Sequence, residues 1–278
     1  MWSRLQLLLI IFHTYLEIVL NVPLGLWYRW RQRHGDSAAA EAAIFRRSRR
    51  WAQSLFRRMH VQVEVEGLEH VPAAGPLVVM TNHQSMWDIP LLMGYLGRTV
   101  GFVAKRELFR LPAFAFWMRL IHSVPLDRSD PRAGARMMDS LAADMKQHGY
   151  AMVVFPEGTR SRHPDGELGP FRRGSLRLAT TNDLPILPVS IEGTRFLSDM
   201  QALARTRRGG RVVRLKVAPP VLVSHQSSLQ AKAFAEELRA TIENNRNTIR
   251  LTWPAQARTE PDPDAPAAAA LPTSAKSS

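Results

Sequence analysis

The sequence of 278 residues contains no cysteine, and this absence excludes several kinds of site at once. Without thiols the chain can form neither disulfide bonds nor thiolate metal sites, and it cannot use a cysteine nucleophile. The histidines, such as His60, His122 and His148, have no spacing typical of metal ligands, so we expect no metal. A reducing compartment is allowed by this composition but is not required by it.

Acidic residues are too few to balance the basic ones. The chain has 37 lysines and arginines against 24 aspartates and glutamates, which gives a formal net charge of +13. This charge predicts an anionic partner, such as a nucleic acid, an acidic lipid surface, an acidic carrier protein or a phosphorylated substrate. Nucleic acid is not expected, because no helix-turn-helix, zinc-finger or aromatic RNA-binding motif accompanies the charge.

The longest apolar stretch, Leu5 to Tyr28, lacks the clean composition of a membrane span. As a helix it would measure about 36 Å, enough to cross a hydrocarbon core of about 30 Å. Pro23 and Gly25 interrupt it, however, and one helical stripe carries the polar residues Gln6, His13, Glu17 and Asn21. We therefore predict a membrane-embedded or interfacial hairpin whose polar stripe faces protein or headgroups, in preference to a spanning helix. The basic run that follows, Arg29, Arg31 and Arg33, would lie on the cytoplasmic side.

A second helix is predicted from Ala38 to Met59. Its apolar side chains recur on one stripe, namely Ile44, Trp51, Leu55 and Met59. Its basic side chains lie largely off that stripe, namely Arg46, Arg47, Arg50, Arg57 and Arg58. Such a helix either packs on the core with a solvated basic face or contacts a membrane, and the preceding apolar stretch favours the membrane. Residues 1–60 are therefore assigned to membrane-associated helices.

Residues 61–253 are predicted to form one α/β domain. Val61, Val63 and Val65 alternate with polar residues, which is typical of a half-buried strand. Continuous apolar runs predict buried strands at Leu77–Met80, Val100–Ala104, Ala151–Phe155 and Ile186–Ile191, and helical patterns occur at Pro131–His148 and Ser228–Asn245. The alternation predicts a mixed, mostly parallel sheet flanked by helices. Pro188 should place its strand at an edge or a bulge, and the tail at 254–278 should be disordered.

A first polar block, NHQSMWD at residues 82–88, directly follows the apolar run Leu77–Met80. Reactive groups collect at the carboxyl ends of strands in α/β sheets. If His83 lies in the turn and Asp88 in the first turn of the next helix, the carboxylate can orient the imidazole and stabilise its cation. The same spacing also arises by chance, as a turn histidine beside an N-cap carboxylate.

A second block, FPEGTRSR at residues 155–162, follows another buried run. Gly158 permits a positive φ, Arg160 can bind a phosphate through two hydrogen bonds, and Glu157 can accept from a hydroxyl. These groups suit a polyol phosphate, although an ordinary loop with solvated charges has the same composition. Lys105 and Arg128 each follow an apolar segment and could add positive charge, or could be a solvated lysine and a partner of Asp127.

Taken in order, these blocks resemble the lysophosphatidic acid acyltransferase family, within the glycerolipid acyltransferases that carry an Asn-His-x4-Asp motif. The resemblance covers about Val61 to Val223 and rests on NHQSMWD, VAKREL (103–108) with LDR downstream, FPEGTRSR and LPILPVSIEGT (184–194). FPEGTRS distinguishes it from the lipid A acyltransferases, which share the His-x4-Asp pattern. The resemblance implies a glycerol-3-phosphate acyltransferase-like fold.

The resemblance also implies an activity. An acyl group would move from acyl-CoA or acyl carrier protein to the sn-2 hydroxyl of 1-acyl-glycerol-3-phosphate, giving phosphatidic acid, with no cofactor besides that donor. His83 would be the general base and Asp88 its orienting partner. The residues implied in substrate binding are Asn82, Lys105, Arg128, Glu157, Gly158, Thr159 and Arg160. Backbone N–H groups near Gly158 could stabilise the oxyanion.

Some alternatives stay open. The acceptor could be another lysolipid, such as a lysophosphatidylethanolamine or a lyso-aminolipid, and a non-catalytic membrane scaffold would keep the same fold. A covalent route through Ser85 is disfavoured, because no Gly-x-Ser-x-Gly elbow is present. The segment Leu184–Val189 is expected to pack as a strand with no chemistry of its own. Family members commonly carry a membrane-associating helical segment, so we expect the protein on the cytoplasmic face of the inner or plasma membrane.

Overall fold

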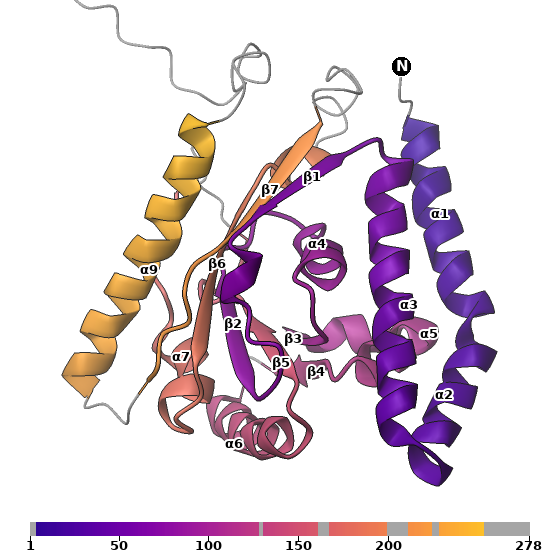
Figure 1. Ribbon diagram of the computed structural model, residues 1–278, viewed down its shortest axis with the longest axis horizontal. Coiled ribbons are helices and arrows are strands. Elements are labelled where there is room, and N and C mark those ends of the chain that lie inside the picture. The colour runs from indigo at the N-terminus through magenta and orange to yellow at the C-terminus, as the bar shows by residue number, and fades with distance from the viewer. Residues whose placement is uncertain (1–3, 128–129, 161–166, 199–210, 224–227, 253–278) are drawn as a thin grey trace, which may run out of the picture.

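The computed structural model describes residues 4–127, 130–160, 167–198, 211–223 and 228–252. Figure 1 shows a group of N-terminal helices packed beside a layered α/β domain. The helices are α1 (Arg4–Leu20), α2 (Val22–His34), α3 (Ser37–Arg58), α4 (Asp88–Tyr95), α5 (Pro112–Leu120), α6 (Pro131–His148), α7 (Arg173–Thr180) and α9 (Ser228–Leu251). Short 3-10 helices lie at Leu68–His70, Arg106–Arg110 and Arg195–Leu197. The predicted tail at 254–278 lies outside the described residues.

The apolar stretch at the N-terminus is divided between α1 and α2. The break falls at Asn21, whose side chain donates to the carbonyl of Glu17 at 2.6 Å. Pro23 lies in the first turn of α2, where a missing N–H costs no helical hydrogen bond. Among the helices that the structure describes, none combines the length and the apolar character needed to cross a bilayer.

Two residues of the predicted polar stripe, Glu17 and Asn21, face α3. Arg58 donates to both carboxylate oxygens of Glu17, at 3.0 and 2.5 Å. Arg47 donates to the side-chain oxygen of Asn21. The prediction that this stripe faces protein is therefore confirmed for Glu17 and Asn21, and these contacts fix α1 against α3.

The apolar stripe of α3 is part of the protein core. Ile44, Leu55 and Met59 are buried in one hydrophobic cluster with residues of the sheet and of α4. Burial of this stripe supports the alternative in which α3 packs on the core, and contact of its basic face with a membrane stays a prediction. The large exposed apolar side chains of the N-terminal helices lie instead on α1 and α2, among them Phe12, Leu16, Leu20, Leu26, Trp27 and Trp30.

The domain contains a seven-stranded sheet within the described residues. Its strands are β1 (Gln62–Glu66), β2 (Leu77–Thr81), β3 (Val100–Lys105), β4 (Val124–Leu126), β5 (Ala151–Val154), β6 (Ile186–Glu192) and β7 (Val212–Val217). They lie in the order β1-β7-β6-β2-β5-β3-β4, and β6 with β7 is the antiparallel pair. The predicted mixed, mostly parallel sheet is therefore confirmed.

Helices cover both faces of the sheet, as Figure 1 shows. Leu77 and Val79 point into a cluster shared with α3, α4 and α5. Val78 and Met80 point into a second cluster shared with α6, α7 and α9. A strand buried on both faces has no polar alternation, which explains its continuous apolar sequence.

Pro188 lies in β6, between β2 and β7. The edge alternative for this strand is wrong, and the bulge alternative is confirmed by the register. Val189 pairs with Val217 but Ile186 pairs with Val221, so the segment opposite Pro188 holds one extra residue. The carbonyl of Pro188 accepts from Ala218 at 2.9 Å at this bulge.

Candidate functional site

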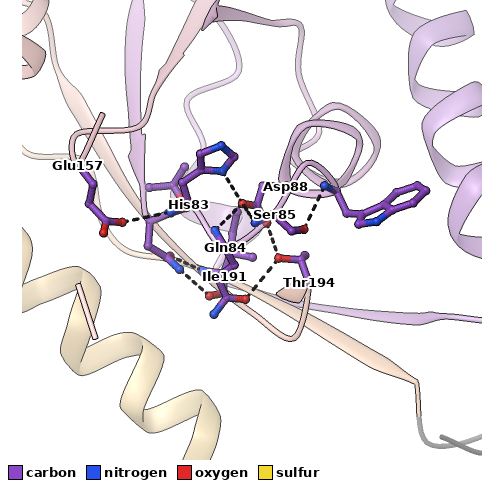
Figure 2. A network of polar contacts seen from close by, with 10 residues as sticks. His83, Gln84, Ser85, Asp88, Glu157, Ile191 and Thr194 are labelled. Carbon is purple, nitrogen blue, oxygen red and sulfur yellow. Dashed lines mark hydrogen bonds and ion pairs between the residues drawn. The ribbon is translucent and has the colours of Figure 1, made fainter. Parts of the chain in front are cut away.

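His83 and Asp88 are in contact at the carboxyl end of β2. His83 lies in the turn after the strand and Asp88 is the first residue of α4. The His83 Nδ1 atom lies 2.7 Å from Asp88 Oδ2 (Figure 2). The Asp88 side chain is fully buried, whereas 16% of the His83 side chain is exposed. The predicted contact between these two side chains is confirmed.

The backbone of the turn holds the Asp88 carboxylate in place. The N–H groups of Gln84 and Ser85 donate to Oδ2 at 2.7 and 2.9 Å, so this oxygen accepts three hydrogen bonds in all. An ionised carboxylate only accepts, which assigns the shared proton to Nδ1 of His83. The Nε2 atom is then the basic nitrogen of the ring. The Phe155 ring stacks on the imidazole with centroids 4.0 Å apart, which restricts its rotation.

Thr194 completes the surroundings of Asp88, and sequence reasoning did not find it. Its hydroxyl donates to Asp88 Oδ1, the second carboxylate oxygen, and lies 3.3 Å from Gln84 Oε1 (Figure 2). Thr194 follows the end of β6 and lies beyond the segment Leu184–Val189 that was expected to pack as a strand. The available signal was a hydroxyl residue two positions beyond a buried strand, next to Gly193.

A cavity of about 1220 Å³ lies beside His83. The α/β domain forms one wall of it, and α1 and α3 form another. Its apolar lining includes Trp87, Met93, Phe102, Phe114, Trp117 and Met118. Its cationic lining on the domain side includes Lys105, Arg160 and Arg172. The imidazole therefore shares one partly apolar cavity with the guanidinium group of Arg160.

The sequence-predicted cationic residues lie at the rim of this cavity. Lys105 ends β3, with its ammonium 3.2 Å from Glu107 and its side chain largely exposed. Thr159 and Arg160 are exposed and line the cavity. Arg128, also predicted to bind substrate, lies outside the described residues. The described part of the set thus places two positive charges near His83.

Gly158 adopts the expected positive φ, at 69°. A side chain there would meet Arg172, since an added Cβ would lie 2.9 Å from its Nε atom. Its N–H donates to the carbonyl of Phe155 at 3.0 Å. The N–H of Gly158 itself is therefore used within the turn, and stabilisation of the oxyanion by other backbone N–H groups near Gly158 stays a prediction.

Glu157 lies behind the site and is only 6% exposed. One carboxylate oxygen accepts from the N–H of His83 at 3.3 Å and the other from the N–H of Gly169 at 3.0 Å. Burial raises the pKa of this carboxyl, while the two N–H groups oppose the rise. Glu157 is not among the residues that line the cavity, so its position corrects the expected contact with a substrate hydroxyl. Glu157 instead joins the two loops that carry the predicted motifs.

Asn82 also has a structural position. It is completely buried, and its amide donates to Ile191 O at 2.9 Å and accepts from Ile191 N at 2.8 Å. Since both amide groups are engaged and the residue does not line the cavity, the expected contact with substrate is corrected here too. Ser85 is likewise buried, and its hydroxyl accepts from the N–H of Trp87 at 3.1 Å. Within the described ranges, no three His, Asp or Glu side chains are grouped to hold a metal ion.

Comparison with known proteins gives consistent matches. The model of the family described as Acyltransferase matches residues 62–192. A chloroplastic 1-acyl-sn-glycerol-3-phosphate acyltransferase of Brassica napus is 31% identical over 191 residues, which are 68% of this chain and 52% of that protein. A 1-acyl-sn-glycerol-3-phosphate acyltransferase of Pseudomonas aeruginosa is 35% identical over 130 residues, which are 47% of this chain and 49% of that protein. The chain thus spans about half the length of these two relatives.

A solved structure is similar over more of the chain. It is the crystal structure of the 1-acyl-sn-glycerophosphate (LPA) acyltransferase PlsC from Thermotoga maritima, with 28% identity and a TM-score of 0.70. The similarity covers 88% of this chain and 97% of that one. A coverage this wide includes at least part of the N-terminal helices.

Proposed function

The chain belongs to the lysophosphatidic acid acyltransferase family, and from this premise we propose that it transfers an acyl group from a thioester donor to the sn-2 hydroxyl of 1-acyl-glycerol-3-phosphate. The product is phosphatidic acid and the released group is the carrier thiol. The observation that carries the proposal is the His83 imidazole, held by Asp88, on the wall of a large, partly apolar cavity that Lys105 and Arg160 also line.

His83 acts as the general base. Because its Nδ1–H is bonded to Asp88, Nε2 is available to remove the proton of the glycerol hydroxyl as the oxygen attacks the thioester carbonyl. The buried carboxylate stabilises the imidazolium that forms. When the tetrahedral intermediate collapses, the carbon–sulfur bond breaks and the imidazolium returns the proton to the departing sulfur. A placed base of this kind contributes about 10²- to 10⁴-fold in rate.

We assign direct transfer without a covalent acyl-enzyme. The position of Ser85 supports this assignment, because its hydroxyl is buried and already bonded to the backbone of Trp87. Both substrates must then occupy the cavity together. Lys105 and Arg160 bind the phosphate of the acceptor, with Gly158 and Thr159 forming the adjacent loop surface. Backbone N–H groups of this loop other than that of Gly158 stabilise the oxyanion.

Two features support a membrane-bound location for the reaction. Phe12, Trp27 and Trp30 expose about half or more of their surface on α1 and α2. Arg29, Arg31 and Arg33 lie on the same α2 helix, and each arginine near an anionic surface adds about 1 kcal/mol of attraction. We propose that these helices rest at the cytoplasmic leaflet, so that an acyl chain can pass from the bilayer to the cavity.

A thioester-release assay tests the activity. Purified protein is given oleoyl-CoA or oleoyl-acyl carrier protein with lysophosphatidate, lysophosphatidylethanolamine and a lyso-aminolipid, and release of carrier thiol is followed. We expect the highest kcat/KM with lysophosphatidate, and a loss of about 10²-fold or more in His83→Ala. Release that is unchanged in His83→Ala, or an absence of release with every lysolipid, would refute the proposal. A preference for another lysolipid would support acyl transfer with His83 as the base, but it would show that the acceptor is not lysophosphatidate.

Vesicle binding tests the location. The paired substitution Trp27→Glu and Trp30→Glu should weaken sedimentation with anionic vesicles, because it replaces exposed apolar surface with charge of the same sign as the lipid. Glu69→Gln, on an exposed turn of the domain, is the control. Equal binding by the Trp27/Trp30 variant and the control would contradict the assignment of these helices to the membrane.

A further inference from the structure

The wall that α3 contributes to the cavity is strongly basic. Most of its lining residues recur on one face of the helix, among them Ala43, Arg46, Arg47, Arg50, Trp51, Ser54 and Arg58. The carboxylate that α1 adds opposite them is Glu17. Four arginines against one glutamate leave a formal charge of +3 on this wall. This charge is separate from Lys105 and Arg160, which belong to the domain side.

The four arginines divide into two pairs. Arg58 is held by Glu17 and Arg47 by Asn21, so both guanidinium groups are already oriented at the wall. Arg46 and Arg50 are exposed, and neither forms an ion pair within the part of the chain that the structure describes. Like charges four residues apart on a helix destabilise it. A bound anion would remove this repulsion.

Two further polar groups on this wall have no partner. The indole nitrogen of Trp51 and the hydroxyl of Thr14 are buried and, among the described residues, without a hydrogen-bond partner. Both residues line the cavity. Buried polar groups are normally bonded, so an unbonded donor facing a cavity indicates a ligand atom or an ordered water. The wall therefore offers hydrogen-bond donors together with its positive charge.

Two anionic substrates must be bound at once if the acyl group passes directly between them, and this step rests on the proposed function. The domain-side cations serve the phosphate of the acceptor. Acyl-CoA and acyl carrier protein both present the acyl group on a phosphopantetheine arm, whose phosphate is their shared anionic group. We propose that the α3 wall binds the phosphopantetheine phosphate of the acyl donor through Arg46 and Arg50, the two arginines of the wall that form no ion pair among the described residues; the Arg50 Nε atom donates only to the carbonyl of Arg46, at 3.4 Å. Arginine suits this task, because its planar fork binds phosphate through two hydrogen bonds.

The test compares two donors that differ by one phosphate, oleoyl-phosphopantetheine and oleoyl-pantetheine. Wild type should show a lower KM for the phosphorylated donor. In the double variant Arg46→Gln and Arg50→Gln, this KM should rise about 10-fold, as for the loss of a charged hydrogen bond, while the KM for oleoyl-pantetheine stays unchanged. The KM for lysophosphatidate should also stay unchanged. The matched control is Arg132→Gln and Arg136→Gln, two exposed arginines with the same spacing on α6, outside the residues that line the cavity.

Three results would overturn the inference. The first is an equal rise in KM for both donors. The second is a rise confined to lysophosphatidate, which would assign the wall to the acceptor. The third is unchanged donor kinetics with weaker sedimentation on phosphatidylglycerol vesicles, which would assign the wall to lipid headgroups.

Equilibrium binding of free 4′-phosphopantetheine to the full-length His83→Ala protein gives a readout without turnover. We expect the Arg46/Arg50 substitutions to weaken it about 10-fold and the control pair to leave it unchanged. If wild type releases no thiol while this binding depends on Arg46 and Arg50, the proposed function fails and the phosphate site stands. If the substitutions leave binding of 4′-phosphopantetheine unchanged, the proposed phosphate site is refuted, whether or not the wild-type protein is active.

Discussion

Two hydrogen bonds join the Asn82 side chain to the backbone of Ile191. The Asn82 amide donates to the carbonyl of Ile191 at 2.9 Å and accepts from its N–H at 2.8 Å, so the side chain imitates the edge of a strand. It extends the pairing of β2 with β6 by one position, to the residue that precedes His83. The asparagine of the motif therefore sets where the turn carrying the general base begins.

Asn82→Ala should destabilise the protein by about 2–4 kcal/mol, because it leaves the buried N–H and C=O of Ile191 without partners. Urea unfolding followed by circular dichroism measures this loss, and activity should fall as the turn shifts. Asn182→Ala is the control, since that side chain makes a single bond at a partly exposed position. Equal stability of the two variants would show that the double bond to Ile191 does not hold the strands together.

Thr194→Val should lower kcat/KM about 10-fold. The substitution keeps the shape of the side chain but removes the hydroxyl that donates to Asp88 Oδ1. The carboxylate therefore loses one of the hydrogen bonds that hold its orientation. Thr194→Ser keeps the hydroxyl and should restore most of the activity. If kcat and its pH profile are the same in the valine variant as in wild type, Thr194 does not position the dyad.

Gly25→Ala should destabilise the protein by about 1–3 kcal/mol, because the new Cβ would lie 2.4 Å from the Phe116 ring and force α2 away from α5. Thermal unfolding measures the effect. Gly134→Ala is the matched control in α6, where the added Cβ would sit 3.6 Å from Leu126. That variant should be as stable as wild type or more so. If Gly25→Ala unfolds at the same temperature as wild type, the close contact of α2 with α5 does not contribute to the stability of the protein.

Glu41 and His122 connect α3 to the loop before β4, with His122 Nε2 lying 3.0 Å from Glu41 Oε1. The hydrogen bond from His122 holds the pKa of Glu41 below its usual value of 4.5, against the effect of burial. A carboxyl with a lowered folded-state pKa stabilises the fold above its unfolded pKa, and this contribution is lost as the pH falls through the folded value.

Glu41→Gln should therefore lower the free energy of unfolding by about 0.5–1 kcal/mol at pH 7. The difference from wild type should shrink as the pH falls below about 4.5. Urea unfolding across pH 3.5 to 7.5 measures this, with Glu237→Gln, exposed on α9, as the control. A difference that stays constant over this range would contradict the contribution of the ionised carboxylate.

The sequence predicted the strands that are buried on both faces, because apolar runs such as Leu77–Met80 admit no other environment in a small α/β domain. It did not predict β4 or β7. The first has only three residues and includes Pro125, and the second includes Arg214 and Lys216, whose charges are balanced by Glu64 and Glu66 on β1. Both segments form strands because they pair with a neighbouring strand of the sheet, and this pairing leaves no pattern in the local sequence.

In the site, the contact of His83 with Asp88 was predicted from the motif together with the family resemblance, because the spacing alone also fits a turn histidine beside an N-cap carboxylate. The positions of Glu157 and Asn82 could not be predicted in the same way. A carboxylate and an amide beside a predicted base look the same in sequence whether they face a substrate or the backbone behind it. Thr194 was missed because its contact with Asp88 joins strand ends that are distant in the chain.

The pairing of β1 with β7 also affects how the chain folds on the ribosome. β1 is the first strand to be synthesised, yet its parallel neighbour β7 is the last strand described and lies between it and β6. A nascent chain that ends before Val212 contains β2, β3, β5 and β6, but it lacks β7, the strand with which β1 pairs. Until β7 has been synthesised, helices α1 to α3 can pack on the core only through their own side chains, because β1, which follows them, has no strand to pair with. Such late, long-range closure makes folding slow and leaves an apolar surface for a chaperone to shield.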